Sequence, residues 1–171
     1  MKLILLRCPN CGEPLEPGND DVVLACNNCH TPVAIAVNGP QKIAVRFVDP
    51  GKTGKGNWWF PFWVFKGQVR IQKRETQGGS RSGRKDSEKM WGMTRHLYVP
   101  AWEMSMHAAQ DIGSRLITKQ PPLRFVEQPA EANLVSATVT PKDAKKLLEF
   151  VILAIEARRK DCDSGPASAQ V

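Results

Sequence analysis

Four of the five cysteines in the chain form two matched pairs. Two residues separate Cys8 from Cys11, two separate Cys26 from Cys29, and fourteen residues lie between the pairs. Two cysteines three positions apart can direct both sulfur atoms at one ion, and two such turns complete a tetrahedron of thiolates at about 2.3 Å. Four thiolates favour zinc, with iron as the main competitor. The spacing therefore predicts one Zn²⁺ ion bound by Cys8, Cys11, Cys26 and Cys29.

The residues around these cysteines suit a structural ion. Four protein ligands leave no coordination position for a substrate water, so the ion is expected to stabilise the fold and not to catalyse. Pro9 fixes a backbone angle in the first turn, and Gly12 allows a positive φ after the second ligand. We expect His30 at the surface and not as a fifth ligand, and Cys162 as a free thiol in a polar tail.

Three other interpretations of the cysteines stay open at this point. Two disulfides would require an oxidising compartment, for which the sequence offers no export signal. A thioredoxin-like redox pair would require a βαβ pattern that the flanking sequence lacks. A rubredoxin-like iron site has similar turns with a longer spacer.

The two cysteine pairs resemble the ligand turns of the zinc β-ribbon superfamily, over roughly residues 5–32. This resemblance implies that Cys8, Cys11, Cys26 and Cys29 are ligands at the tips of two hairpins. His30 departs from the pattern, since Gly often follows the last cysteine. The ribbon, a Pro-Phe-Trp strand and a basic hairpin together also resemble uncharacterised bacterial zinc-ribbon proteins, a likeness that supplies no activity.

The remaining sequence predicts the elements that would support this site. Residues 63–74 alternate, with Trp63, Phe65, Val69 and Ile71 on one face and cations on the other, as in a half-buried strand. The other expected elements are strands at 32–37, 42–47, 94–106, 123–127 and 134–139, a helix at 107–117, and a helix that begins at Thr140 and leaves residues 150–155 ambiguous between helix and strand.

These elements predict a fold class and boundaries. The fold class is a small N-terminal zinc β-ribbon plus a β-rich α+β domain, an antiparallel sheet with one or two helices. The expected ribbon spans residues 1–36 and the β-rich domain spans 40–160. A long basic hairpin loop is expected at 75–90, and a disordered tail at 161–171.

The chain has a formal net charge of +7, and one segment carries most of it. Residues 66–95 contain nine Lys or Arg and three acids, a local balance of +6. A nucleic-acid-binding protein would use such a segment to follow phosphates, with tryptophans stacking on bases. The contact residues expected for that function are Lys66, Arg70, Lys73, Arg74, Arg81, Arg84, Lys85, Arg95, Trp58, Trp59 and Trp91.

A protein-interaction adaptor or complex subunit is the competing function, and we favour it by a small margin. The aromatic stretch that begins at Trp58 would form an interface with an acidic or apolar protein partner. A row of cations on a strand is often only a solvated face or protection of a sheet edge. The same residues therefore do not decide between the two functions.

Catalysis and membrane insertion are not expected. His107 and Asp111 stand four apart, but an acid–base or metal pair needs more convergent partners. The glycine-rich residues 51–56 lack the spacing of a phosphate-binding loop. The chain has no apolar run near the roughly 18 residues that cross a bilayer. We therefore expect a cytoplasmic protein that is not an enzyme.

Overall fold

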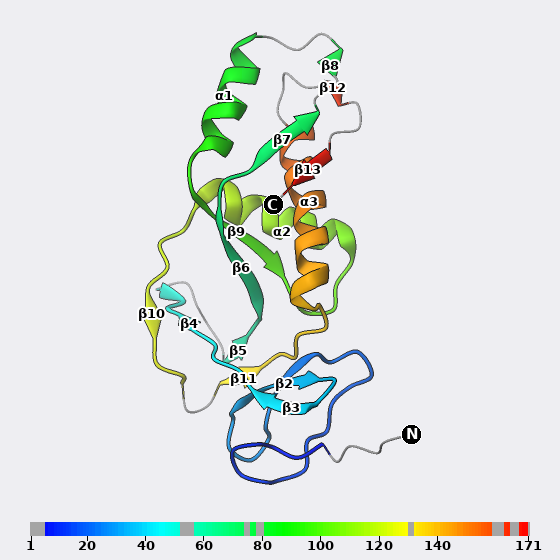
Figure 1. Ribbon diagram of the computed structural model, residues 1–171. Helices are drawn as coiled ribbons and strands as arrows, with labels where there is room; N and C mark the ends of the chain where they lie inside the picture. Colours follow the sequence, from blue (N-terminus) through cyan, green and yellow to red (C-terminus); the bar gives the residue numbers. More distant parts are fainter. Residues whose placement is uncertain are drawn as a thin grey trace. The chain divides into compact units, whose positions relative to one another are not determined.

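The computed structural model describes the backbone of residues 6–51, 57–73, 76–77, 81–129, 132–158, 163–164 and 168–170, and side chains within 6–51, 57–71, 85–129 and 132–158. It is a β-rich α+β fold (Figure 1). The chain divides into two compact units, each built from three stretches. Unit 1 comprises residues 1–61, 101–103 and 122–140, and unit 2 comprises 62–100, 104–121 and 141–171. These boundaries differ from the contiguous domains expected at 1–36 and 40–160.

Unit 1 contains a three-stranded antiparallel sheet in the order β1–β2–β3. Its strands are β1 (Val23–Ala25), β2 (Pro32–Ala36) and β3 (Gly39–Lys42). The outer edge of β1 is completed from far along the chain, because Val22 N–H donates to Ala137 O at 2.7 Å. This bond explains why residues after 122 belong to the same unit as the cysteines.

Two shorter strand pairs complete unit 1. Strand β4 (Phe47–Val48) pairs antiparallel with β10 (Phe125–Val126). Strand β5 (Trp58–Trp59) pairs in parallel with β11 (Asn133–Leu134). The rings of Phe47 and Trp59 meet edge to face, with centroids 5.3 Å apart.

Unit 2 is organised around the antiparallel pair of β6 (Phe62–Gly67) and β9 (Arg95–Pro100). Helices α2 (Met106–Lys119) and α3 (Pro141–Ala157) pack against β9 and against each other. Leu97 and Val99 of β9 are completely buried. Of the alternation predicted along 63–74, the part up to Ile71 is confirmed, because its odd-numbered residues are half-buried or buried and its even-numbered residues are exposed. The single strand expected there is instead divided, since β6 ends at Gly67 and the next strand begins at Arg70.

The prediction of a hairpin loop at 75–90 is wrong for residues 81–90, which are helical. Helix α1 spans Arg81–Gly92, after strands β7 (Arg70–Lys73) and β8 (Thr76–Gln77). The sequence is polar and rich in Gly and Ser, so its pattern does not predict a helix. One turn of α1 is nevertheless anchored in unit 2: Trp91 Nε1–H donates to Glu156 Oε1 at 2.7 Å, and Ser87 Oγ–H donates to Glu156 Oε2 at 2.9 Å.

Three further expectations about elements change. Residues 43–46, within the strand expected at 42–47, form no strand, because β3 ends at Lys42 and β4 begins at Phe47. The strand expected at 94–106 ends at Pro100, and helix α2 begins after Ser105, whose side chain accepts a hydrogen bond from Ala108 N–H. The tail expected to be disordered contains the short strands β12 (Asp163–Ser164) and β13 (Ser168–Gln170), which pair with β8 and β7.

Both predicted helices are confirmed as α2 and α3. The ambiguous residues 150–155 are helical, because Leu148, Val151, Ile152 and Ile155 lie on one buried face of α3. None of the helices that the structure describes is long and apolar enough to span a bilayer.

Candidate metal centre

The four cysteines lie in two turns with the same hydrogen bonds. In the first turn, Gly12 N–H donates to Cys8 O at 2.9 Å and Cys8 N–H donates to Glu13 O at 2.8 Å. In the second, the equivalent bonds join His30 N–H to Cys26 O at 2.8 Å and Cys26 N–H to Thr31 O at 3.0 Å.

The residue after each second cysteine has a positive φ, as predicted for the first turn. The φ angle is 79° at Gly12 and 55° at His30. His30 therefore adopts the left-handed conformation for which glycine is better suited. The carbonyl of His30 accepts a hydrogen bond from Gln128 Nε2 at 3.0 Å, which ties the second turn to a later segment of unit 1. The departure from glycine does not change the shape of the turn.

The sulfur atoms converge on one point. The Sγ atoms of all four cysteines lie within 4.8 Å of one another. Cys8 and Cys29 are 3.6 Å apart between sulfurs, and so are Cys11 and Cys26. A tetrahedron with Zn–S bonds of about 2.3 Å has sulfur–sulfur edges of about 3.8 Å. The four thiolate ligands therefore fit one structural Zn²⁺ ion.

Two of the ligands also belong to the small hydrophobic core around the cysteines. Cys8 and Cys26 are buried and form one cluster with Leu15, Leu24 and Val33. Two of the five buried residues in this cluster are thus sulfur ligands. Because the apolar core is so small, the bound ion is expected to contribute much of the folding free energy of this segment.

Hydrogen bonding separates the acidities of two ligands. Hydrogen bonds to the Thr31 side chain and then to its backbone lower the pKa of Cys29 to about 5. At Cys11 the hydrogen bond to the Glu13 backbone lowers the pKa, but desolvation and the thiols of Cys29 and Cys26 outweigh it and raise the pKa to about 11. At neutral pH, Cys29 is therefore already a thiolate, whereas Cys11 is a thiol that must release its proton to solvent when zinc binds.

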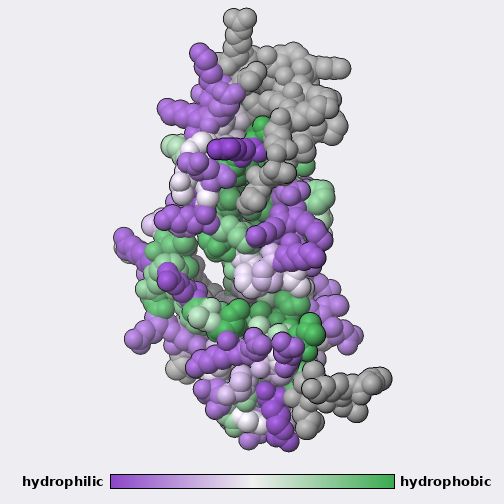
Figure 2. Space-filling view, viewed as in Figure 1, coloured by the Kyte–Doolittle hydropathy of each residue, from purple (hydrophilic) through white to green (hydrophobic). Residues whose placement is uncertain are grey.

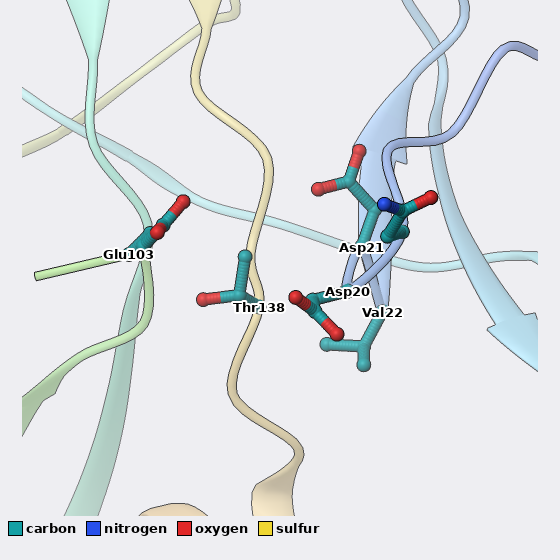
Figure 3. Close-up of a pocket in the computed structure, with 6 residues that line it drawn as sticks. Asp20, Asp21, Val22, Glu103 and Thr138 are labelled. Carbon is teal, nitrogen blue, oxygen red and sulfur yellow. The ribbon is translucent and has the colours of Figure 1, made fainter.

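An acidic hollow of about 530 Å³ also lies in unit 1 (Figure 3). Its lining includes Asp20, Asp21, Glu103 and Thr138. One oxygen of Asp21 accepts a hydrogen bond from Gly18 N–H at 2.9 Å. Among the described residues, the cysteines are the one group of three or more His, Cys, Asp or Glu whose ligand atoms come close enough for an ion. The hollow therefore does not add a metal centre.

The residues expected to contact a partner are divided between the two units. Lys66, Arg70 and Lys85 are exposed in unit 2, whereas Trp58 is 67% exposed in unit 1. Trp59 is half-buried against Phe47. Arg74 lies outside the described residues, and only the backbone is described for Lys73, Arg81 and Arg84.

Two of the expected contact residues are instead structural, which corrects the prediction. Trp91 is 2% exposed and uses its indole N–H on Glu156, so its ring offers no face for stacking. Arg95 is half-buried and donates to two main-chain carbonyls, Met90 O and Ile117 O, both at 3.0 Å. Trp91 and Arg95 were expected to be exposed because they flank a loop, but both side chains form hydrogen bonds within unit 2.

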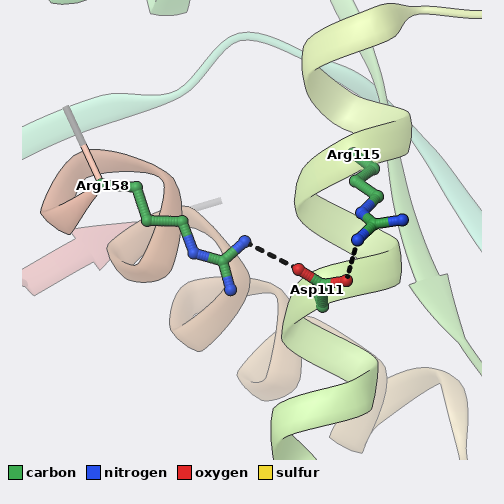
Figure 4. Close-up of polar contacts among 3 residues, drawn as sticks. All are labelled: Asp111, Arg115 and Arg158. Carbon is green, nitrogen blue, oxygen red and sulfur yellow. Dashed lines mark hydrogen bonds and ion pairs between the residues drawn. The ribbon is translucent and has the colours of Figure 1, made fainter.

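Asp111, four residues after His107 on α2, binds two arginines. Asp111 lies between Arg115, at 2.9 Å, and Arg158, at 3.0 Å (Figure 4). Each arginine binds a different oxygen of the carboxylate. The contact with Arg158 joins α2 to the residue after α3, which is a structural role.

Two exposed apolar groups lie in unit 1; Phe60 belongs to the aromatic stretch expected to form an interface, but its contact with Trp102 and the exposed side chains of β10 were not predicted. The first is the aromatic pair Phe60 and Trp102, whose ring centroids are 4.9 Å apart, with Phe60 50% exposed. The second is β10, where Phe125 is 50% and Val126 42% exposed. Figure 2 shows hydrophobic side chains over β10 and β4 among hydrophilic ones. Both groups depend on contacts between distant segments, which sequence periodicity does not report.

No family model, curated protein or solved structure matches the chain. The assignment of this site therefore rests on the geometry of the four sulfur atoms.

Proposed function

We propose that the chain is a non-enzymatic protein-interaction module whose N-terminal segment is a zinc ribbon. The matched turns at Cys8 and Cys26, with the same pair of main-chain hydrogen bonds, support the ribbon assignment. Zinc would hold these turns as a rigid support for the segments that pack with them in unit 1. Thiolate ligands also require a reducing compartment, which favours the cytoplasm.

The observation that carries this proposal is a set of aromatic residues in unit 1, called here the aromatic cluster: the contacting pair Phe60 and Trp102, with Trp58 two positions before Phe60 in the chain. Trp58 is 67% and Phe60 50% exposed, and the ring of Phe60 packs against that of Trp102 with the two planes tilted by 50°. Large rigid aromatic side chains lose little conformational entropy when they become buried, and they dominate the binding energy of many interfaces. The cluster is suited to an apolar protein partner.

Position-specific photo-crosslinking tests the proposal. A benzoylphenylalanine replacing Phe60 should crosslink a distinct protein in cells. The matched control is Phe150 on α3 in unit 2, which is 49% exposed and should not yield that product. Cys8→Ser should weaken the product from position 60 if zinc supports the surface. Equal products from both positions, or none from position 60, would reject the aromatic cluster as the docking surface.

Nucleic-acid binding is the second candidate, supported by the exposed cations Lys66 and Arg70 on one alternating face. The buried Trp91 removes one of its expected stacking groups. Anisotropy of labelled single- and double-stranded oligonucleotides across a salt series tests this function. Micromolar binding near 150 mM salt that weakens steeply with salt, and falls in Lys66→Glu/Arg70→Glu, would favour it over the adaptor.

A further inference from the structure

The aromatic cluster and the acidic hollow of unit 1 are carried by segments that main-chain hydrogen bonds join. Ala101 N–H donates to Pro61 O at 3.0 Å, and Thr138 N–H donates to Ala101 O at 2.7 Å. Phe60 precedes Pro61, and Trp102 follows Ala101. Because Thr138 lines the hollow, the contacting aromatic pair and the hollow share one hydrogen-bonded framework.

The two ends of the hollow are held in the same framework. Val22, which follows the two aspartates of the hollow, donates its N–H to Ala137 O at 2.7 Å. Glu103 lies on the other side of Thr138 from those aspartates in Figure 3 and directly follows Trp102 in the chain. The hollow therefore extends from the residue after Trp102 to the segment that precedes β1.

The hollow carries negative charge that no described cation neutralises. Asp20, Asp21 and Glu103 line it, and its other lining residues are uncharged. None of the ion pairs among the described side chains involves these three carboxylates. The chain as a whole has a formal net charge of +7, so the hollow departs from the overall charge. It should attract a cationic group and repel the phosphates of a nucleic acid.

The hollow suits an organic cation better than a metal ion. Among the described residues, its carboxylates are not among the groups whose ligand atoms come close enough to share a metal. A guanidinium spreads five N–H donors over a planar fork, so it can reach carboxylates that are distributed around a hollow. The volume of about 530 Å³ also lies in the range of about 300–1,000 Å³ that is typical of ligand pockets.

We propose that the aromatic cluster binds a basic segment of a partner protein, with an arginine in the acidic hollow and apolar side chains against Phe60 and Trp102. This inference rests on the proposed function, because it names the partner chemistry of the same surface. An extended segment advances about 3.3 Å per residue, so a few residues separate the arginine from the apolar side chains. The aromatic rings supply apolar burial, and the carboxylates supply specificity.

A pair of short peptides tests this chemistry. The probe is the acetylated, amidated heptapeptide Pro-Leu-Pro-Arg-Pro-Leu-Pro, which its prolines keep extended. Added to the ¹⁵N-labelled, zinc-loaded full chain, it should shift the amide signals of Asp21 and Glu103 and the indole signal of Trp102. Citrulline in place of the arginine keeps the shape without the charge, and should weaken binding at least about fivefold. Added salt should weaken the arginine peptide alone.

Matched variants assign the effect to the hollow. Asp20→Asn/Glu103→Gln should weaken the arginine peptide at least about threefold and leave the citrulline peptide unchanged. Glu149→Gln, at an exposed position of α3, should have no effect. Phe60→Ala should weaken both peptides alike, since it removes apolar contact only.

Two results would overturn the inference: equal affinity for the two peptides, or no saturable shift in unit 1 up to about 5 mM of the arginine peptide. Either result leaves the proposed function standing if the crosslink at position 60 forms, because that product does not depend on the charge of the partner. Loss of the crosslink itself would instead remove the docking surface.

Discussion

Gln120 binds both main-chain groups of His96 through its side-chain amide. His96 N–H donates to Gln120 Oε1 at 3.0 Å, and Gln120 Nε2 donates to His96 O at 2.8 Å. The same Nε2 donates to Ile117 O at 2.9 Å, and Gln120 N–H donates to Leu116 O at 2.9 Å. At this point of β9 a side chain takes the place of a neighbouring strand. These bonds hold Gln120 at a φ of 46°, which is unusual for a residue other than glycine.

We predict that Gln120→Ala destabilises unit 2 by about 1–3 kcal/mol, because two main-chain groups of His96 lose their partners. Gln120→Gly loses the same bonds but suits the positive φ, so its loss should be up to about 1 kcal/mol smaller. Urea denaturation of the three proteins separates the amide from the backbone angle. A Gln120→Ala chain as stable as wild type would contradict this account of the edge.

We predict that Gly113→Ala lowers the stability of unit 2. A Cβ there would lie 3.0 Å from Tyr98 O and 3.0 Å from Val151 Cγ1. The gain in helix propensity of about 1 kcal/mol is offset by overpacking of about 1–3 kcal/mol, since a main-chain carbonyl of β9 cannot move aside.

Gly92, at the end of α1, is the matched control for Gly113. A Cβ at Gly92 meets no atom within 4 Å. Gly92→Ala should therefore leave stability unchanged or raise it by up to about 1 kcal/mol. Melting temperatures that fall equally for the two variants would refute the steric explanation.

The two ligand turns should respond oppositely to substitution. Gly12→Ala should cost about 1–2 kcal/mol of zinc-loaded stability, because a Cβ has free space there but the φ of 79° disfavours it. His30→Gly should be stabilising or neutral, because glycine relieves the left-handed backbone at 55°. Chelator competition at fixed pH measures both. A stabilised Gly12→Ala would show that the turn does not need its positive φ.

Removal of zinc should loosen the two ligand turns selectively. We expect the amides of Cys8, Gly12, Cys26 and His30, which form the matched turn bonds, to lose hydrogen-exchange protection on chelation. The amides of Leu97 and Val99 in the buried strand β9 should keep theirs, because unit 2 has its own core. Unchanged exchange at the four turn amides would exclude a structural role for the ion.

Zinc affinity should rise with pH, because protons compete with the ion for the sulfurs. Cys11, with a pKa of about 11, contributes about tenfold per pH unit across the neutral range. Cys29, with a pKa of about 5, is already a thiolate there and adds another tenfold per unit only below that value. A chromophoric chelator titrated from pH 4 to 8 should therefore show a steeper slope at the acid end. A constant slope would contradict the low pKa of Cys29.

The sequence predicts the parts of the molecule that depend on nearby residues. The cysteine spacing determines the ligand turns, and the alternation of residues 63–71 reports which face of β6 is buried. Helix α1 escapes prediction because Trp91 reaches Glu156, a partner 65 positions away. The bonds of Gln120 to His96 have the same origin, since a separation of 24 residues leaves no periodic signal. Long-range pairing of polar groups is what sequence pattern does not reveal.

The interleaved boundaries at 61, 100, 103, 121 and 140 have a consequence for how this chain is made and divided. A fragment ending at residue 61 would carry all four cysteines but would lack Ala137, which completes the edge of β1. The zinc-binding unit is therefore not a cassette that recombination could transfer intact in one piece. During synthesis, the edge of β1 can be completed only after residue 137 has left the ribosome. By then most of unit 2 has already been translated.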